Sequence, residues 1–145
     1  MGERRLWLSL APVIAALILS APLLAHHGNA AFESKVVSAK GTVVEWLWSN
    51  PHCLLKFDEK TDSGEVHHWV VETQAPANMI EVGWSKNSFK PGDEITVDIK
   101  PAKAGKFVGA ISKVTLPDGK VLWAWGTGPN AGAITGRTPE SSPNQ

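Results

Sequence analysis

Residues 94–100 show the clearest alternation of apolar and polar positions in the chain. Ile95, Val97 and Ile99 fall on one side of this stretch, and charged or hydroxyl-bearing side chains fall on the other. An alternation with a period of two residues predicts a β-strand with one face toward the core. The same period runs through residues 65–73 and gives this set for the expected core face: His67, Trp69, Val71 and Thr73.

Residues 41–58 form the most apolar stretch outside the N-terminal region. The first half is β-branched, aromatic or aliphatic, which suits a pleated, half-buried surface. Pro51 then interrupts the run, because proline fixes φ and has no N–H to offer to a neighbouring strand. The pattern predicts two antiparallel strands. The first begins near residue 36 or 41 and ends at Trp48, and the second covers residues 52–58.

A short helix is predicted over residues 75–83. Pro76 falls in the first turn, where proline is tolerated, and Gly83 can close the C-terminal end. Residues 109–116 are typical of a fifth strand, and a turn leads from it into a short segment at residues 120–125.

The order of these elements is three strands, a helix and two strands, so we expect an all-β fold with one short helix. A helix between the third and fourth of five strands favours a small, OB-like, partly open barrel. The alternative is a small sandwich that uses residues 120–125 as a sixth strand. The expected division is a signal peptide at 1–25, the barrel domain at 26–125 and a flexible, glycine-rich tail at 126–145.

The N-terminal region has the features of an export signal. Arg4 and Arg5 give a basic start, residues 6–24 are apolar with few interruptions, and Ala25 suits cleavage. A membrane anchor is the alternative, because the apolar run approaches spanning length. We expect a cleaved protein that is periplasmic or secreted and is no longer embedded in the membrane.

The charge and the cysteine content limit the kinds of partner and of disulfide that the cleaved chain is expected to have. Loss of Glu3, Arg4 and Arg5 changes 14 basic and 14 acidic side chains to 12 and 13, a net charge of −1. A nearly neutral protein of this kind indicates no nucleic-acid partner. Cys53 is the single cysteine, so no internal disulfide can form. We expect it to be a small buried side chain, with an intermolecular disulfide as the alternative.

Histidines provide the candidate metal ligands. Cleavage after residue 25 would leave an α-amine on His26, and an amine with an imidazole from one residue is a chelate that favours Cu(II). His27 or His52, at the tip of the predicted turn, would supply a further nitrogen. The alternative is that the N-terminal pair is a disordered start and His52 a turn residue. His67 and His68 point to opposite faces of one strand and cannot hold the same ion.

Tryptophans provide the candidate contacts for an organic ligand, since six of them fall after residue 25. We expect three to be large core side chains: Trp46, Trp69 and Trp84. The other three are the candidates for an aromatic surface that stacks on a ring or a sugar: Trp48, Trp123 and Trp125. The competing interpretation is that all six fill the core of a small barrel.

Several short motifs carry a resemblance to a known family. They are His26-His27-Gly28, the Gly41 to His52 element ending in N-P-H, Trp69 with Glu72 and Pro76, Gly83-Trp84 with Phe89-Lys90-Pro91-Gly92-Asp93, and the V-T-L-P-D-G run at 114–119. On these motifs the chain resembles a family of small exported bacterial proteins of unknown function. The resemblance implies no activity, and His67 and His68 lie outside it.

Three classes of function follow. The first is an exported envelope module that binds an unknown small ligand, and the second is a copper-binding or copper-handling protein. The third is an accessory subunit that docks on another envelope protein. An enzyme is less expected, because Ser49 near His52 and Glu45 is the sole nucleophile arrangement, and sequence proximity does not establish a triad. No catalytic residue is assigned.

Overall fold

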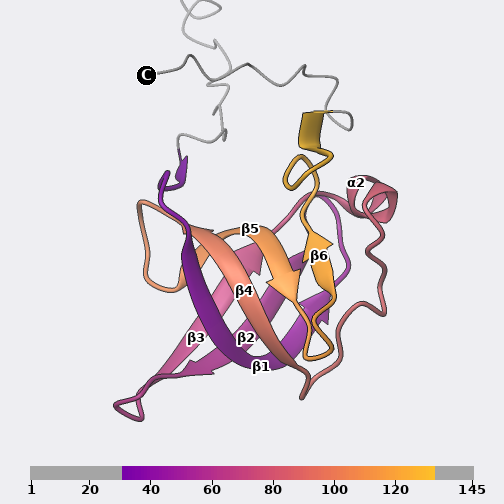
Figure 1. The fold of residues 1–145 in the computed structure, drawn as a ribbon. Coiled ribbons are helices and arrows are strands. Elements are labelled where there is room, and N and C mark those ends of the chain that lie inside the picture. The colour runs from indigo at the N-terminus through magenta and orange to yellow at the C-terminus, as the bar shows by residue number, and fades with distance from the viewer. Residues whose placement is uncertain (1–30, 133–145) are drawn as a thin grey trace, which may run out of the picture.

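The computed structural model describes residues 31–132 (Figure 1). Strands dominate this part of the chain, with one short helix. The elements are β1 (Val37–Leu47), β2 (Leu54–Lys60), β3 (Val66–Glu72), α2 (Pro76–Glu81), β4 (Glu94–Pro101), β5 (Val108–Thr115) and β6 (Val121–Trp123). The predicted all-β class and the helix between the third and fourth strands are confirmed.

Pairing between the strands closes a barrel. The order in the sheet is β3-β2-β1-β4-β5-β6, and β3 also pairs with β5. The β3–β5 pairing is parallel, whereas the other pairings are antiparallel. Five strands therefore form a closed, mixed barrel of the OB-like kind, as predicted. The sixth strand of the alternative sandwich does exist as β6, but it extends the sheet beside β5 instead of forming a second layer.

The core of the barrel follows the predicted alternation. Ile95, Val97 and Ile99 of β4 are buried, and so are Trp69 and Val71 of β3. Buried positions on the facing strands complete the same cluster: Ala39, Val43, Leu55, Phe57, Ile111 and Val114. Burial of this apolar surface supplies the main favourable term for folding.

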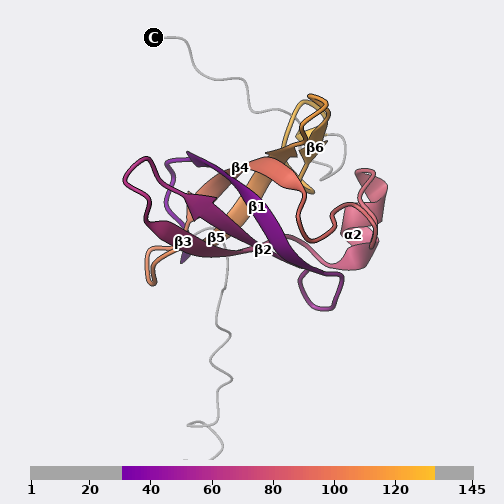
Figure 2. The same ribbon diagram turned by 90° about the horizontal axis from the view of Figure 1, so that it is seen from below.

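Helix α2 lies to one side of the strands in both ribbon views (Figures 1 and 2). Its anchor is Met79, which is fully buried and receives a hydrogen bond from the Thr73 hydroxyl at 3.1 Å. The chain leaves the helix through Gly83, which has a φ of 85°. Glycine tolerates this left-handed conformation, as predicted for the end of the helix. Within residues 31–132, no helix has the length and apolar character needed to cross a membrane.

The segment before β1 is held to the end of β4 by backbone contacts. Phe32 forms an isolated antiparallel bridge with Ala102. The Glu33 N–H donates to the Pro101 carbonyl at 2.8 Å, and the Lys103 N–H donates to the Ala31 carbonyl at 3.0 Å. The described chain therefore begins at a fixed place on the barrel rim, beside the β4–β5 loop.

Candidate functional site

The turn between β1 and β2 and the end of β3 bring His52 and Glu72 together. The Nδ1 atom of His52 lies 3.2 Å from Oε2 of Glu72. Backbone bonds fix the approach, because the Thr73 N–H donates to the Cys53 carbonyl at 2.9 Å and the Cys53 N–H donates to the Gln74 carbonyl at 3.2 Å. Two motif residues 20 positions apart in the chain thus form one pair, which we call the His52–Glu72 pair.

The geometry of this pair determines what the imidazole can do. The carboxylate beside Nδ1 favours the tautomer that carries its proton on this nitrogen, which leaves the lone pair on Nε2. The two side chains are 43% and 37% exposed, so the pair lies at the surface. A carboxylate that orients an imidazole in this way is the usual outer partner of a metal-binding histidine.

Strand register places the start of the described chain on the same rim. Glu72 of β3 pairs with Ala110 of β5, and Ala110 pairs with Lys100 of β4. Directly paired residues project to the same face of a sheet, and these three face outward, between the buried positions of their strands. The small Ala110 therefore separates the His52–Glu72 pair from Lys100 on the outer surface.

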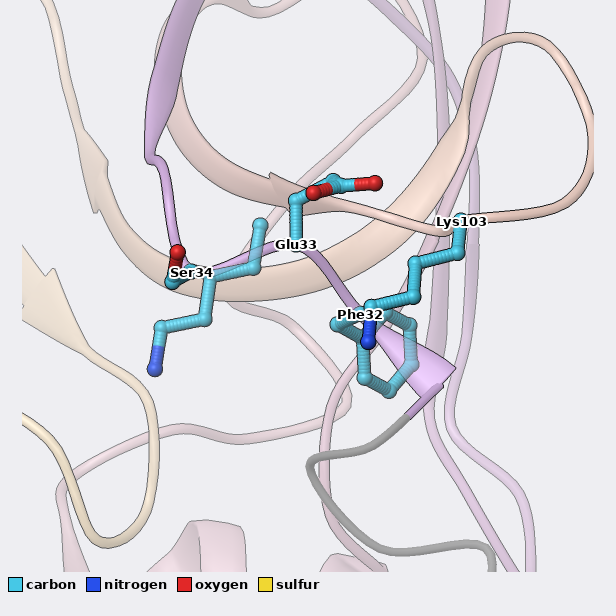
Figure 3. Close-up of a pocket in the computed structure, with 5 residues that line it drawn as sticks. Phe32, Glu33, Ser34 and Lys103 are labelled. Carbon is cyan, nitrogen blue, oxygen red and sulfur yellow. The ribbon is translucent and has the colours of Figure 1, made fainter.

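A hollow of about 500 Å³ lies next to Lys100, where the segment before β1 meets the β4–β5 loop. Its lining is Phe32, Glu33, Ser34, Lys100 and Lys103 (Figure 3). In this view the Glu33 carboxylate points away from the Lys103 amine, and no ion pair joins the charged groups of this lining in residues 31–132. The hollow is polar, and its Glu33 and Lys103 side chains do not point toward one another.

The adjacent histidines of β3 are engaged separately. His67 Nδ1 lies 3.1 Å from Glu59 Oε2, and the His67 ring stacks on Phe107 at 4.0 Å between centroids. His68 Nδ1 lies 2.6 Å from Asp58 Oδ1. Their side chains are 20% and 75% exposed, which agrees with the expectation that they face opposite sides.

Metal ligands do not gather within the described part of the chain. Residues 31–132 contain no cluster of three or more histidine, cysteine, aspartate or glutamate side chains that fits a metal ion. Of the three predicted metal ligands, His52 is placed as described above. His26 and His27 lie outside the described residues, so the predicted N-terminal chelate stays a prediction.

The three tryptophans expected in the core differ in how deeply they are buried. Trp69 and Trp84 are buried, whereas Trp46 is half-buried and packs against the core. Each indole N–H has an internal acceptor: Ser85 O for Trp46 at 3.0 Å, Glu59 Oε2 for Trp69 at 2.8 Å and Trp123 O for Trp84 at 2.7 Å. Such partners are expected when tryptophan is buried.

The tryptophans expected at a ligand surface are all half-buried. Trp48 contacts Trp46, with 5.7 Å between ring centroids. Trp125 donates its indole N–H to Glu81 Oε2 at 3.1 Å, so this side chain is tied to the end of α2. Trp123 lines a cleft of about 270 Å³ between β6 and α2. Sequence reasoning missed Glu81 and Asn130, which also line this cleft, because no local pattern distinguishes them from other surface polar residues.

Cys53 is fully buried, as expected, and its thiol lies 3.9 Å from the Ser49 carbonyl oxygen. Removal from water raises the pKa of the Cys53 thiol above its ordinary value, and the hydrogen bond to Ser49 acts weakly in the opposite direction. The thiolate is the reactive form, so this side chain has the environment of a structural cysteine.

Comparison with known proteins gives a family and no activity. No curated protein matches the chain. Residues 15–112 match a family of unknown function, DUF6152, and this range contains β1 to β4 and most of β5. Both members of the His52–Glu72 pair fall inside the matched range, whereas β6 and the loop that follows it lie beyond its end. The match spans more than half of the chain, and the protein therefore belongs to the DUF6152 family of unknown function.

Proposed function

We propose that the protein is an exported binding module of the cell envelope, and that one of its ligands is a divalent copper ion. The observation that carries this proposal is the His52–Glu72 pair, with Nδ1 of the imidazole 3.2 Å from the carboxylate. The carboxylate would hold the ring so that Nε2 faces the ion. One imidazole is too few for a stable site, so His26 and His27 would supply the remaining nitrogens.

Strand spacing supports a shared site. Neighbouring strands lie about 4.8 Å apart, so Glu72 and Lys100, two strands apart through Ala110, have backbones separated by about 10 Å. The chain before Ala31 starts beside Lys103, close to this row. The five residues 26–30 can span at most about 17 Å when extended. The proposal therefore requires these five residues to fold back along this row toward the pair.

Export is part of the proposal, because the chelate needs a free amine on His26. The basic start, the apolar run and Ala25 support cleavage and a periplasmic or secreted protein. Mass spectrometry of the protein recovered from the envelope fraction tests this step. A species that begins at His26 is expected, and an intact Met1 would exclude the amine chelate.

Copper calorimetry on that cleaved protein tests the site itself. The parent should bind one ion, and His52→Ala should weaken binding by about tenfold or more, since it removes one nitrogen ligand. One added residue before His26 should also weaken it, because the amine moves away from the imidazole. Binding should weaken at acidic pH, as protonated imidazoles do not coordinate metals.

The matched control is His68→Ala, because His68 is also an exposed histidine paired with a carboxylate but lies outside the proposed site. Copper affinity should be unchanged in this variant and in His67→Ala. Equal affinity in the parent, His52→Ala and the extended N-terminus would show that the ion binds elsewhere or only adventitiously.

Docking on another envelope protein is a second candidate function. The supporting observation is that two apolar side chains remain exposed, Ile80 of α2 by 62% and Val121 of β6 by 38%. Ile80→Ser should then reduce recovery of a partner in a cross-linked pull-down without changing copper binding. Identical recovery with both proteins would contradict docking through this surface.

A further inference from the structure

We propose that the cleft between β6 and α2 is a second ligand site and that it takes a neutral sugar ring. This inference rests on the broader proposal of an exported binding module, but it does not depend on copper binding. The cleft has a volume of about 270 Å³ and is built from three segments: the end of α2, the strand β6 and the loop after β6. Sites for drug-sized ligands begin at about 300 Å³, so this cleft suits a single ring.

Charge at the cleft argues against an anionic ligand. Glu81 is the charged side chain among the lining residues. Its Oε2 atom accepts the Trp125 indole N–H at 3.1 Å, which fixes the carboxylate at the cleft wall. The other carboxylate oxygen has no hydrogen bond within residues 31–132 and is suited to accept one from a ligand hydroxyl. A ligand carboxylate or phosphate would instead be repelled.

The surroundings of Trp123 argue against an organic cation. A Cβ atom placed on Gly128 would overlap the Trp123 ring, so the loop backbone packs directly on the indole. The Lys113 amine lies 5.3 Å from the ring centroid, in the position of a cation–π contact. A second cation at this ring would meet both the covered surface and the lysine charge. In the proposed site, Trp123 therefore offers its indole N–H to the ligand and not a ring face.

The remaining groups suit a ring that carries hydroxyls and has an apolar C–H face. Val82, Val121 and Pro129 form apolar parts of the wall. Two hydrogen-bonding side chains of the lining have no hydrogen bond within the described chain, namely the Trp123 indole N–H and the Asn130 amide. Together with Glu81 they provide donors and an acceptor for sugar hydroxyls. The polar hollow beside Phe32 differs from the cleft, because two lysine amines line it and Phe32 is its one apolar lining side chain.

Titrations of the cleaved protein with single compounds, followed by NMR signals of the tryptophan indole N–H groups, test the inference. The probes are glucose, galactose and N-acetylglucosamine as neutral sugars, choline as a cation and gluconate as an anion. At least one sugar should shift the Trp123 signal with a dissociation constant near or below about 1 mM. Choline and gluconate should leave that signal unchanged at the same concentration.

Substitutions inside and outside the cleft test whether the sugar binds there. Glu81→Gln should weaken the sugar about tenfold or more, because it removes a charged acceptor. The matched control is Glu94→Gln, an exposed carboxylate at the start of β4, which should bind the sugar like the parent. Asn130→Ala should also weaken the sugar, and His52→Ala should not.

The outcomes are distinct from those of the copper experiment. If choline or gluconate shifts the Trp123 signal and no sugar does, the ligand class is wrong. If no sugar in the panel shifts it, or if Glu81→Gln and Glu94→Gln behave alike, the cleft is not a sugar site. Copper binding by the Glu81→Gln protein is measured in parallel. A negative sugar result therefore contradicts only the sugar site, and the copper data alone decide the metal proposal.

Discussion

The indole nitrogen of Trp84 lies 2.7 Å from the carbonyl oxygen of Trp123, although 39 residues separate them in the chain. Trp84 also contacts Trp46, with 5.6 Å between ring centroids. One buried side chain thus joins the segment after α2 to β6 and to the end of β1. Because β6 forms one wall of the cleft, the shape of the proposed sugar site depends on this contact.

Replacement of Trp84 by phenylalanine tests that dependence. The variant keeps an aromatic ring in the core but leaves the Trp123 carbonyl without its donor. Unfolding free energy should fall by about 1–3 kcal/mol, from the lost hydrogen bond and the smaller ring. Chemical denaturation measures the change. Trp48→Phe is the control, because the Trp48 indole N–H has no hydrogen bond within residues 31–132, and it should change stability less.

Val97→Asp tests the core face of β4. Val97 is fully buried, so the substitution places an unpaired carboxylate in the barrel interior and should cost several kcal/mol. Thr96→Asp, on the opposite face of the same strand, should have a much smaller effect. Thermal unfolding of both variants distinguishes the faces, and equal melting temperatures would contradict the burial of Val97.

Glu72→Ala tests whether the carboxylate orients His52. The imidazole would remain but would lose its partner at 3.2 Å, so copper affinity should fall by about 10-fold to 100-fold. Copper affinity should fall less in Glu72→Gln, because an amide oxygen can still lie beside the Nδ1 proton. Calorimetry gives both values. A Glu72→Ala protein with parental affinity would mean that the pair plays no part in metal binding.

The buried Cys53 thiol predicts how the stability of the folded protein changes with pH. The thiol of an unfolded chain ionises near its ordinary value of 9.0, whereas burial raises the pKa of the folded thiol. Above pH 9 the unfolded state therefore binds fewer protons than the folded state, and stability should decrease as the pH rises. Cys53→Ala should lack this contribution, so the stability difference between the two proteins should change above pH 9 and be constant below it. Urea denaturation at a series of pH values measures this difference.

Much of the barrel could be predicted because its strands carry local patterns. The period of two in β4 fixes which side chains face inward, and Trp69 follows from the same rule in β3. The order of elements was enough to favour an OB-like barrel over a sandwich. The parallel contact that closes it, between Val70–Glu72 and Val108–Ala110, leaves no local trace, since it depends on how far the whole sheet coils.

The candidate sites were predictable only in part, and for the same reason. His52 was singled out by its place at a proline turn, but its partner Glu72 is a carboxylate on the outer face of another strand. Glu81 and Asn130 meet Trp123 only after β6 has paired with β5. Pairings of this kind follow from register across the sheet, which single-strand patterns do not contain.

The barrel has a weak seam, and this has a consequence for its motions. β3 and β5 share three residue pairs, Val70 with Val108, Val71 with Gly109 and Glu72 with Ala110, whereas β2 and β3 share seven. Proteins open first where few cooperative contacts hold the backbone. Amide protons at this seam should exchange with deuterium before those of β1 and β2. An ion held between His52 and the N-terminal residues would span the rim beside that seam, so metal loading should slow the exchange and act as a clasp on the barrel.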